Sequence, residues 1–181
     1  MLIIPKSPNF LRLSIGRLWN GGRCPDSRLS ALVELQKIET GVEIITTVVL
    51  PTHLLAEAAA GARLENIDSL ERLCLFFVED GGQYLEVELG AGGQYLVLGF
   101  DAPHQKVADF AEVKFTVEHE VNNRGKIKNK ILIPQDFFPA NLVALNAFLV
   151  AGNQTLAYYP LPGNEPDLHQ PAVFPLAKLE A

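Results

Sequence analysis

Short runs in which apolar residues alternate with other residues recur along most of this chain, and they constrain its fold more than any single motif does. Glycine, proline and asparagine separate the runs, and a period of two is typical of half-buried β-strands. The runs cover residues 10–18, 29–38, 42–50, 73–78, 83–89, 94–100, 113–121, 127–133, 142–150 and 155–161. About nine or ten strands at this spacing predict a mostly β protein, an antiparallel β-sandwich or jelly roll rather than a parallel α/β sheet.

One segment departs from the alternating pattern. Residues 54–60 are mostly good helix formers, with Thr52 as a plausible N-cap and Gly61 as a C-terminal stop. The sequence therefore predicts a sandwich with at most one or two short helices. Because no linker-like stretch divides the chain, we expect one domain over residues 1–181.

Composition and charge limit the partners and the cellular location that we expect for this chain. Hydrophobic residues make up 48% of the chain and charged residues 20%, which is typical of a globular protein. The net charge of −6 gives no positive field, so we expect neither nucleic acid nor a membrane surface as a partner. The apolar run near the N-terminus is too short for a signal peptide, and no stretch approaches membrane-spanning length, so we expect a cytoplasmic protein.

The hairpin with arms at residues 83–89 and 94–100 offers the best candidate site. Alternation predicts that one set of its residues faces the core: Leu85, Val87, Leu89, Leu96, Leu98 and Phe100. The other set would then place two tyrosines and two carboxylates on one exposed face of the sheet: Tyr84, Glu86, Glu88 and Tyr95. Such a face suits a sugar, because tyrosine rings stack on it and carboxylates accept hydrogen bonds from its hydroxyls.

Trp19 completes the candidate ligand-binding set. Asn-Gly-Gly follows it, so it lies near a turn, where it would be either an exposed stacking platform or a plug in the core. The alternative for Glu86 and Glu88 is that they only keep a solvated sheet face soluble. Their spacing of about 6–7 Å overlaps the low end for inverting glycosidases, but every exposed Glu-x-Glu strand shares it, so we assign no catalytic residue.

Cofactor and metal motifs are lacking in the sequence. The histidines show no His-x-x-x-His spacing, and a zinc site would have to be assembled purely in space: His53, His104, His119 and His169. Met1 is the only methionine, which disfavours haem held by a His and Met pair, although two histidines remain an alternative. Cys24 and Cys74 are expected as reduced thiols, and we expect no cofactor and no metal.

Several motifs resemble a known family. They include Phe-Phe-Val at 76–78, Gln-Tyr-Leu-Glu-Val-Glu-Leu at 83–89, Gly-Gln-Tyr-Leu-Val-Leu at 93–98, Asn-Ala-Phe at 146–148 and Tyr-Pro-Leu-Pro at 159–162. Further matches are Ile-Pro at 133–134, Phe-Phe-Pro at 137–139, Gly152, Trp-Asn-Gly at 19–21 and Pro-Asp-Leu-His at 166–169. The chain resembles a small uncharacterised family with a vertebrate open-reading-frame member, which is itself similar to family 9 carbohydrate-binding modules and DOMON-like sandwiches.

The resemblance implies a sandwich fold with a non-catalytic, sugar- or cofactor-binding ancestry. In that family and in the sugar-binding modules, the strand before the central hairpin has a Trp followed six residues later by a Glu. The matching positions here are Asp68 and Cys74. This departure supports a second hypothesis, a structural or interaction protein whose ligand pocket has decayed. A third, an intracellular glycoside-processing enzyme, rests only on the two glutamates.

Overall fold

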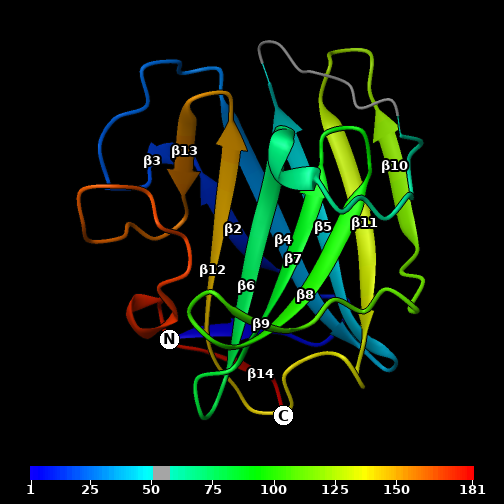
Figure 1. Ribbon diagram of the computed structural model, residues 1–181. Helices are drawn as coiled ribbons and strands as arrows, with labels where there is room; N and C mark the ends of the chain where they lie inside the picture. Colours follow the sequence, from blue (N-terminus) through cyan, green and yellow to red (C-terminus); the bar gives the residue numbers. More distant parts are fainter. Residues whose placement is uncertain (51–57) are drawn as a thin grey trace.

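The computed structural model describes residues 1–50 and 58–181, and these residues form two β-sheets packed face to face (Figure 1). The smaller sheet has five strands in the order β10-β11-β5-β4-β2, and all of its pairings are antiparallel. Its strands are β2 (Leu11–Ile15), β4 (Ser30–Ile38), β5 (Gly41–Val49), β10 (Val117–Val121) and β11 (Ile127–Pro134). Nine-residue β4 and β5 are its longest members and match the predicted runs closely.

The larger sheet has seven strands in the order β3-β13-β12-β6-β7-β8-β9, again antiparallel throughout. Its strands are β3 (Arg17–Leu18), β6 (Arg72–Glu79), β7 (Tyr84–Gly90), β8 (Tyr95–Ala102), β9 (Gln105–Ala108), β12 (Leu142–Ala151) and β13 (Gln154–Ala157). A short parallel pair of β1 (Leu2–Ile4) and β14 (Ala177–Leu179) brings the two ends of the chain side by side (Figure 1).

The predicted antiparallel sandwich is confirmed. In the described part of the chain, helical structure is limited to two one-turn 3-10 helices, η1 (Ile67–Ser69) and η2 (Pro171–Val173). The helix predicted for residues 54–60 falls largely within residues 51–57, outside the described residues. None of the helices in residues 1–50 and 58–181 has the length and apolar character needed to cross a membrane.

The main core lies between the two sheets and follows from the alternation in the sequence. Leu13, Val33 and Ile44 face inward from the smaller sheet, and Phe77 and Val87 meet them from the larger one, each fully buried. Burying such side chains contributes about 1.5–3 kcal/mol each, which fixes the register of every strand that presents them.

The larger sheet is also covered on its outer face, which positions the candidate site. Strand β6 is apolar on both sides, as its unbroken run predicts, and Phe76 and Phe148 form a second core there. The C-terminal segment, residues 158–176, lies over this face and contributes Leu161 and Phe174. The outer face is therefore an interior surface roofed by the chain rather than a solvated sheet.

The register of the β7–β8 hairpin corrects one prediction. Glu86 pairs with Leu98 and Tyr84 with Phe100, and directly paired residues share a face. Leu96, Leu98 and Phe100 therefore lie on the outer face, and the prediction that they face the core is wrong. Tyr95 faces the main core, where its hydroxyl accepts a hydrogen bond from the Phe115 amide at 3.2 Å.

Candidate functional site

The candidate site is a cavity of about 470 Å³ on the outer face of the larger sheet, between the strands and the C-terminal segment. Its floor is formed by β7 and its neighbours, and Pro166–His169 forms one wall. Most of its polar lining carries charge or titrates: Asp68, Arg72, Glu86, Glu88, His104, Asp167 and His169. Ionisable side chains therefore dominate its polar lining, and Leu98, Phe100 and Val150 are among its apolar members.

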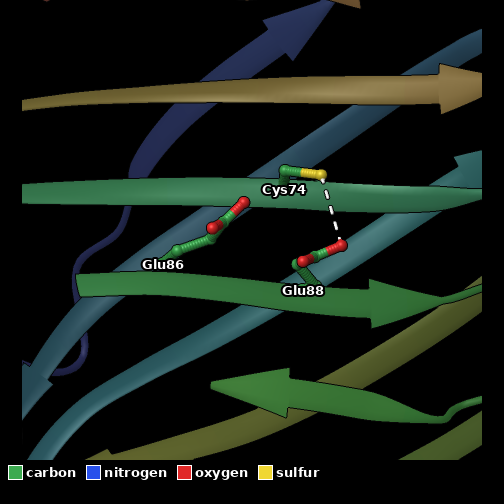
Figure 2. A group of neighbouring side chains, drawn as sticks. All are labelled: Cys74, Glu86 and Glu88. Atoms are coloured by element: carbon green, nitrogen blue, oxygen red, sulfur yellow. Dashed lines mark hydrogen bonds between the residues drawn. The ribbon is translucent and has the colours of Figure 1, made fainter. Parts of the chain in front are cut away.

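Strand geometry brings a thiol and two carboxylates together. Glu86 and Glu88 are two residues apart on β7 and so share its outer face, and Cys74 is the direct partner of Glu88 on β6. Figure 2 shows both carboxylates directed toward β6, with the Cys74 thiol donating to Oε2 of Glu88 at 3.9 Å. All three side chains are buried.

Arg72 supplies the cation of this cluster. It lies two residues before Cys74 on β6, and its Nε forms an ion pair with Oε2 of Glu88. Its Nη1 donates to the carbonyl oxygens of Asp68, at 2.9 Å, and Leu70, at 3.4 Å. The guanidinium is therefore held by η1 and the following turn as well as by Glu88, and one buried charge pair is satisfied.

Glu86 is in a different position from Glu88. It is 5% exposed, and within residues 1–50 and 58–181 no donor lies within hydrogen-bond distance of its carboxylate. The nearest cationic group is Nε2 of His169, 3.9 Å from Oε2. Burial, reinforced by the charge of Glu88, raises the pKa of Glu86 to about 8, and Arg72 opposes this only in part.

The other two members of the cluster shift in the same direction. Burial raises the pKa of Glu88, although the charge and hydrogen bond of Arg72 lower it. Burial, with the charge of Glu88, raises the pKa of the Cys74 thiol well above its ordinary value. A thiol in this state is a poor nucleophile, so the geometry does not indicate thiolate catalysis.

His169 closes the site from the C-terminal segment. Its Nδ1 lies 2.8 Å from the Tyr84 hydroxyl, and its ring packs against Phe76 and Phe100. The ring of His104 lies 4.5 Å away, and burial together with the charge of His104 lowers the pKa of His169. The opposite nitrogen of His169 therefore points toward Glu86 from a fixed ring.

The structure brings together three of the five predicted ligand-binding residues. Tyr84, Glu86 and Glu88 share the outer face, but they lie beneath the C-terminal segment and are at most 5% exposed, so the predicted open face is wrong. Tyr95 lies in the main core and cannot join them. Trp19 is half-buried in the turn after β3 against the outer-face core, does not line the cavity, and fits the plug interpretation.

Four functional candidates were missing from the sequence-based set: Arg72, His104, Asp167 and His169. The sequence did mark Asp167 and His169, since both belong to the Pro-Asp-Leu-His motif of the family resemblance. The role of that motif depends on contacts with residues far away in the sequence. Asp167 accepts from Nε2 of His104 at 3.1 Å, joining the wall to the β8–β9 turn. Nothing in the sequence around Arg72 indicated its pairing.

The fold is an antiparallel β-sandwich like that of the family 9 carbohydrate-binding modules. It is similar to the family 9 module of Caldicellulosiruptor kristjanssonii in complex with glucose (TM-score 0.64, 12% identity, 99% of this chain and 95% of that chain). The same module in complex with cellotriose gives a TM-score of 0.59 at 11% identity, covering 99% and 93%. A putative carbohydrate-binding protein from Bacteroides uniformis gives 0.74 at 12% identity, covering 94% and 87%.

In sequence, the chain is similar to the human UPF0462 protein C4orf33, with 33% identity over 107 residues. That stretch is 52% of this chain and 51% of the human protein, so the match spans about half the length of this relative. No protein-family model matches the chain. The predicted resemblance, to an uncharacterised vertebrate protein and to family 9 modules, is confirmed.

Proposed function

We propose that this chain is a non-catalytic module that binds a small polyhydroxylated ligand, of the carbohydrate class, in the outer-face cavity. The observation that carries the proposal is Glu86, a buried carboxylate that lines an open cavity and receives no hydrogen bond from the described protein. An ionised carboxylate only accepts, so a ligand hydroxyl would supply the donor that the described protein does not.

The remaining lining suits the same ligand class. Sugar hydroxyls both donate and accept, and the cavity offers acceptors at Asp68 and Asp167 and a donor at Arg72. Phe100 supplies apolar surface, and the volume lies within the range of about 300–1,000 Å³ typical of small-molecule sites. The glucose and cellotriose complexes of the structurally similar module support the choice of class.

Binding is favoured over glycoside hydrolysis by the state of the two glutamates. A glycosidase places its carboxylates on either side of the scissile bond, one as an acid and one as a base or nucleophile. Here both carboxylates project from one strand toward one side, and Glu88 is already engaged by Arg72 and Cys74. The arrangement presents one unengaged acceptor to a ligand rather than a flanking pair.

NMR titration of the isotopically labelled protein with glucose, cellobiose and xylose tests the proposal. We expect saturable shifts in β7 and in residues 166–169, and a loss of affinity of at least about tenfold in Glu86→Gln, which corresponds to about 1.4 kcal/mol. Glu112→Gln, which changes an exposed carboxylate outside the cavity, should bind as the wild type does. Absence of saturable shifts at millimolar sugar, or equal binding by both variants, would overturn it.

A structural or interaction role is the second candidate, and one observation favours it. The two positions at which the resemblance implies a tryptophan and a glutamate hold Asp68 and Cys74, so the cavity has no tryptophan platform. Light scattering and a pull-down distinguish the two candidates. A monomer that retains no partner and binds sugar supports the module, whereas a stable complex without sugar binding supports the interaction protein.

A further inference from the structure

Two glutamates of the cavity lining and a thiol buried beside them form a cluster whose chemistry goes beyond sugar binding. The Sγ atom of Cys74 and carboxylate oxygens of Glu86 and Glu88 all lie within 4.8 Å of one another (Figure 2). All three are anchored on neighbouring antiparallel strands, whose backbone is fixed by direct pairing. Ligands held on strands are positioned more precisely than ligands held on loops.

The charges of the cluster are unbalanced when its side chains ionise. One thiolate and two carboxylates face a single guanidinium, that of Arg72, which leaves two net negative charges in a buried place. Buried charge is tolerated when it is paired or when it coordinates a metal. A divalent cation would balance this set.

Glu86 provides an independent indication that something binds there. Its side chain is only 6% exposed, is directed toward β6, and receives no hydrogen bond from residues 1–50 and 58–181. Glu88 has room for a ligand as well. Arg72 and Cys74 both engage its Oε2, and no interaction in the described chain uses its Oε1.

The surroundings have the arrangement of an outer shell. Arg72 is held by the carbonyls of Asp68 and Leu70, so it stays in place beside Glu88 whatever binds to the other oxygen. Nε2 of His169 lies 3.9 Å from Oε2 of Glu86, while its Nδ1 is held by the Tyr84 hydroxyl. His169 therefore lies beside the cluster in a fixed orientation.

We propose that Cys74, Glu86 and Glu88 form a buried three-ligand site for a divalent transition metal of the zinc class, with the fourth position open toward the cavity that Glu86 and Glu88 line. The thiolate selects against magnesium and calcium, which prefer oxygen ligands, and a mixed set of sulfur and oxygen with one open position suits tetrahedral zinc. Bond lengths of about 2.0–2.3 Å place tetrahedral ligands about 3.5 Å apart, so the side chains need to close by about 1 Å. The metal site shares Glu86 with the proposed sugar site, so metal and sugar are tested separately.

Cobalt substitution tests the proposal on the full chain, freed of any affinity tag and treated with a chelator. We expect one equivalent of Co²⁺ to bind, with a thiolate-to-cobalt charge-transfer band and intense visible bands of tetrahedral geometry, and Zn²⁺ to displace it. Cys74→Ser should remove the charge-transfer band. Cys24→Ser should keep it, because Cys24 is an equally free, buried thiol that contacts Asp26 instead.

A second variant guards against loss of fold in Cys74→Ser. Glu86→Gln keeps the size of the side chain, and we expect its Zn²⁺ affinity to fall at least about tenfold while its circular dichroism spectrum stays that of the wild type. No charge-transfer band in the wild type, or a band that survives Cys74→Ser, would overturn the proposal. Repeating the sugar titration in chelator separates the two proposals, since sugar binding by the metal-free protein leaves the module proposal standing whatever the result with cobalt.

Discussion

The Tyr84 hydroxyl lies 2.8 Å from Nδ1 of His169, joining a buried strand residue to the segment that roofs it. Tyr84 is 2% exposed, and its ring stacks on Phe100 at 4.8 Å between centroids. The contact therefore orients the His169 ring, while stacking on Phe100 fixes the Tyr84 ring. It is one of the interactions that decide how firmly residues 158–176 cover the sheet.

Tyr84→Phe should destabilise the protein by about 1–2 kcal/mol, because the half-buried His169 nitrogen loses its partner while the ring packing remains. Urea denaturation measures the change. Tyr159→Phe is the matched control, since Tyr159 is 45% exposed and its hydroxyl has no partner in the described chain. Equal effects of the two substitutions would contradict the role assigned to this hydrogen bond.

Glu86 should make the stability of the metal-free protein depend on pH. Its pKa rises from an ordinary 4.5 to about 8 through burial and the charge of Glu88, against the opposing charge of Arg72, with Cys74 and His169 as the other titratable neighbours. Between these values the folded protein keeps a proton that the unfolded chain has released. The free energy of unfolding should therefore fall as pH rises from about 4.5 to about 8.

Glu86→Gln should flatten this dependence, since the amide cannot ionise. In chelator, we expect the variant to gain on the order of a few kcal/mol relative to the wild type at about pH 8 and little at about pH 5. Glu112→Gln should follow the wild-type curve. Parallel curves for Glu86→Gln and the wild type in urea titrations would show that Glu86 is not the responsible group.

Gly41→Ala should be strongly destabilising for a reason unrelated to the cavity. Gly41 begins β5 opposite Pro134 of β11, and an added Cβ would lie 2.9 Å from the Pro134 Cα and closer still to the Ile133 carbonyl oxygen. Separating the strands should cost about 1–3 kcal/mol or more. Gly16→Ala, where a Cβ meets nothing within 4 Å, should lie within about 0.5 kcal/mol of the wild type by thermal denaturation.

Asn146→Ala should cost about 2–3 kcal/mol, because the carboxamide satisfies both backbone groups of Tyr159. Its Oδ1 accepts from the Tyr159 amide at 3.1 Å and its Nδ2 donates to the Tyr159 carbonyl at 3.0 Å, with the side chain 1% exposed. Hydrogen exchange should also quicken in residues 158–162, where the roofing segment leaves β13. A variant as stable as the wild type would leave the presence of asparagine here unexplained.

The sandwich was predictable because alternation records burial directly. Each long strand places its apolar residues on the main core, and β6 shows by its unbroken apolar run that it is covered twice. Strands β1, β9 and β14 were missed because they have three or four residues, too few to establish a period. Their pairing is decided by tertiary contacts, such as the parallel alignment of Leu2 with Ala177.

The site was predictable only within one strand. Period two groups Tyr84, Glu86 and Glu88 correctly, but it does not state which face of β8 meets them, and the turn between the arms decided against Tyr95. Arg72 begins β6, just after η1, and His169 lies in a segment without regular structure. No sequence spacing therefore relates either residue to β7. Burial of the carboxylates follows from that segment, which alternation cannot foresee.

The order of strands in the larger sheet has a consequence for how fast the chain folds. Strands β6 to β9 follow one another in the chain and pair as neighbours. The other edge of β6 pairs with β12, so Glu79 finds its partner only in Leu142, and Arg72 only in Val150. Closing so large a loop before its contacts form slows folding. Until residue 151 has been synthesised, β6 is an apolar, unprotected edge, and at that stage the nascent chain is most prone to pair with another molecule.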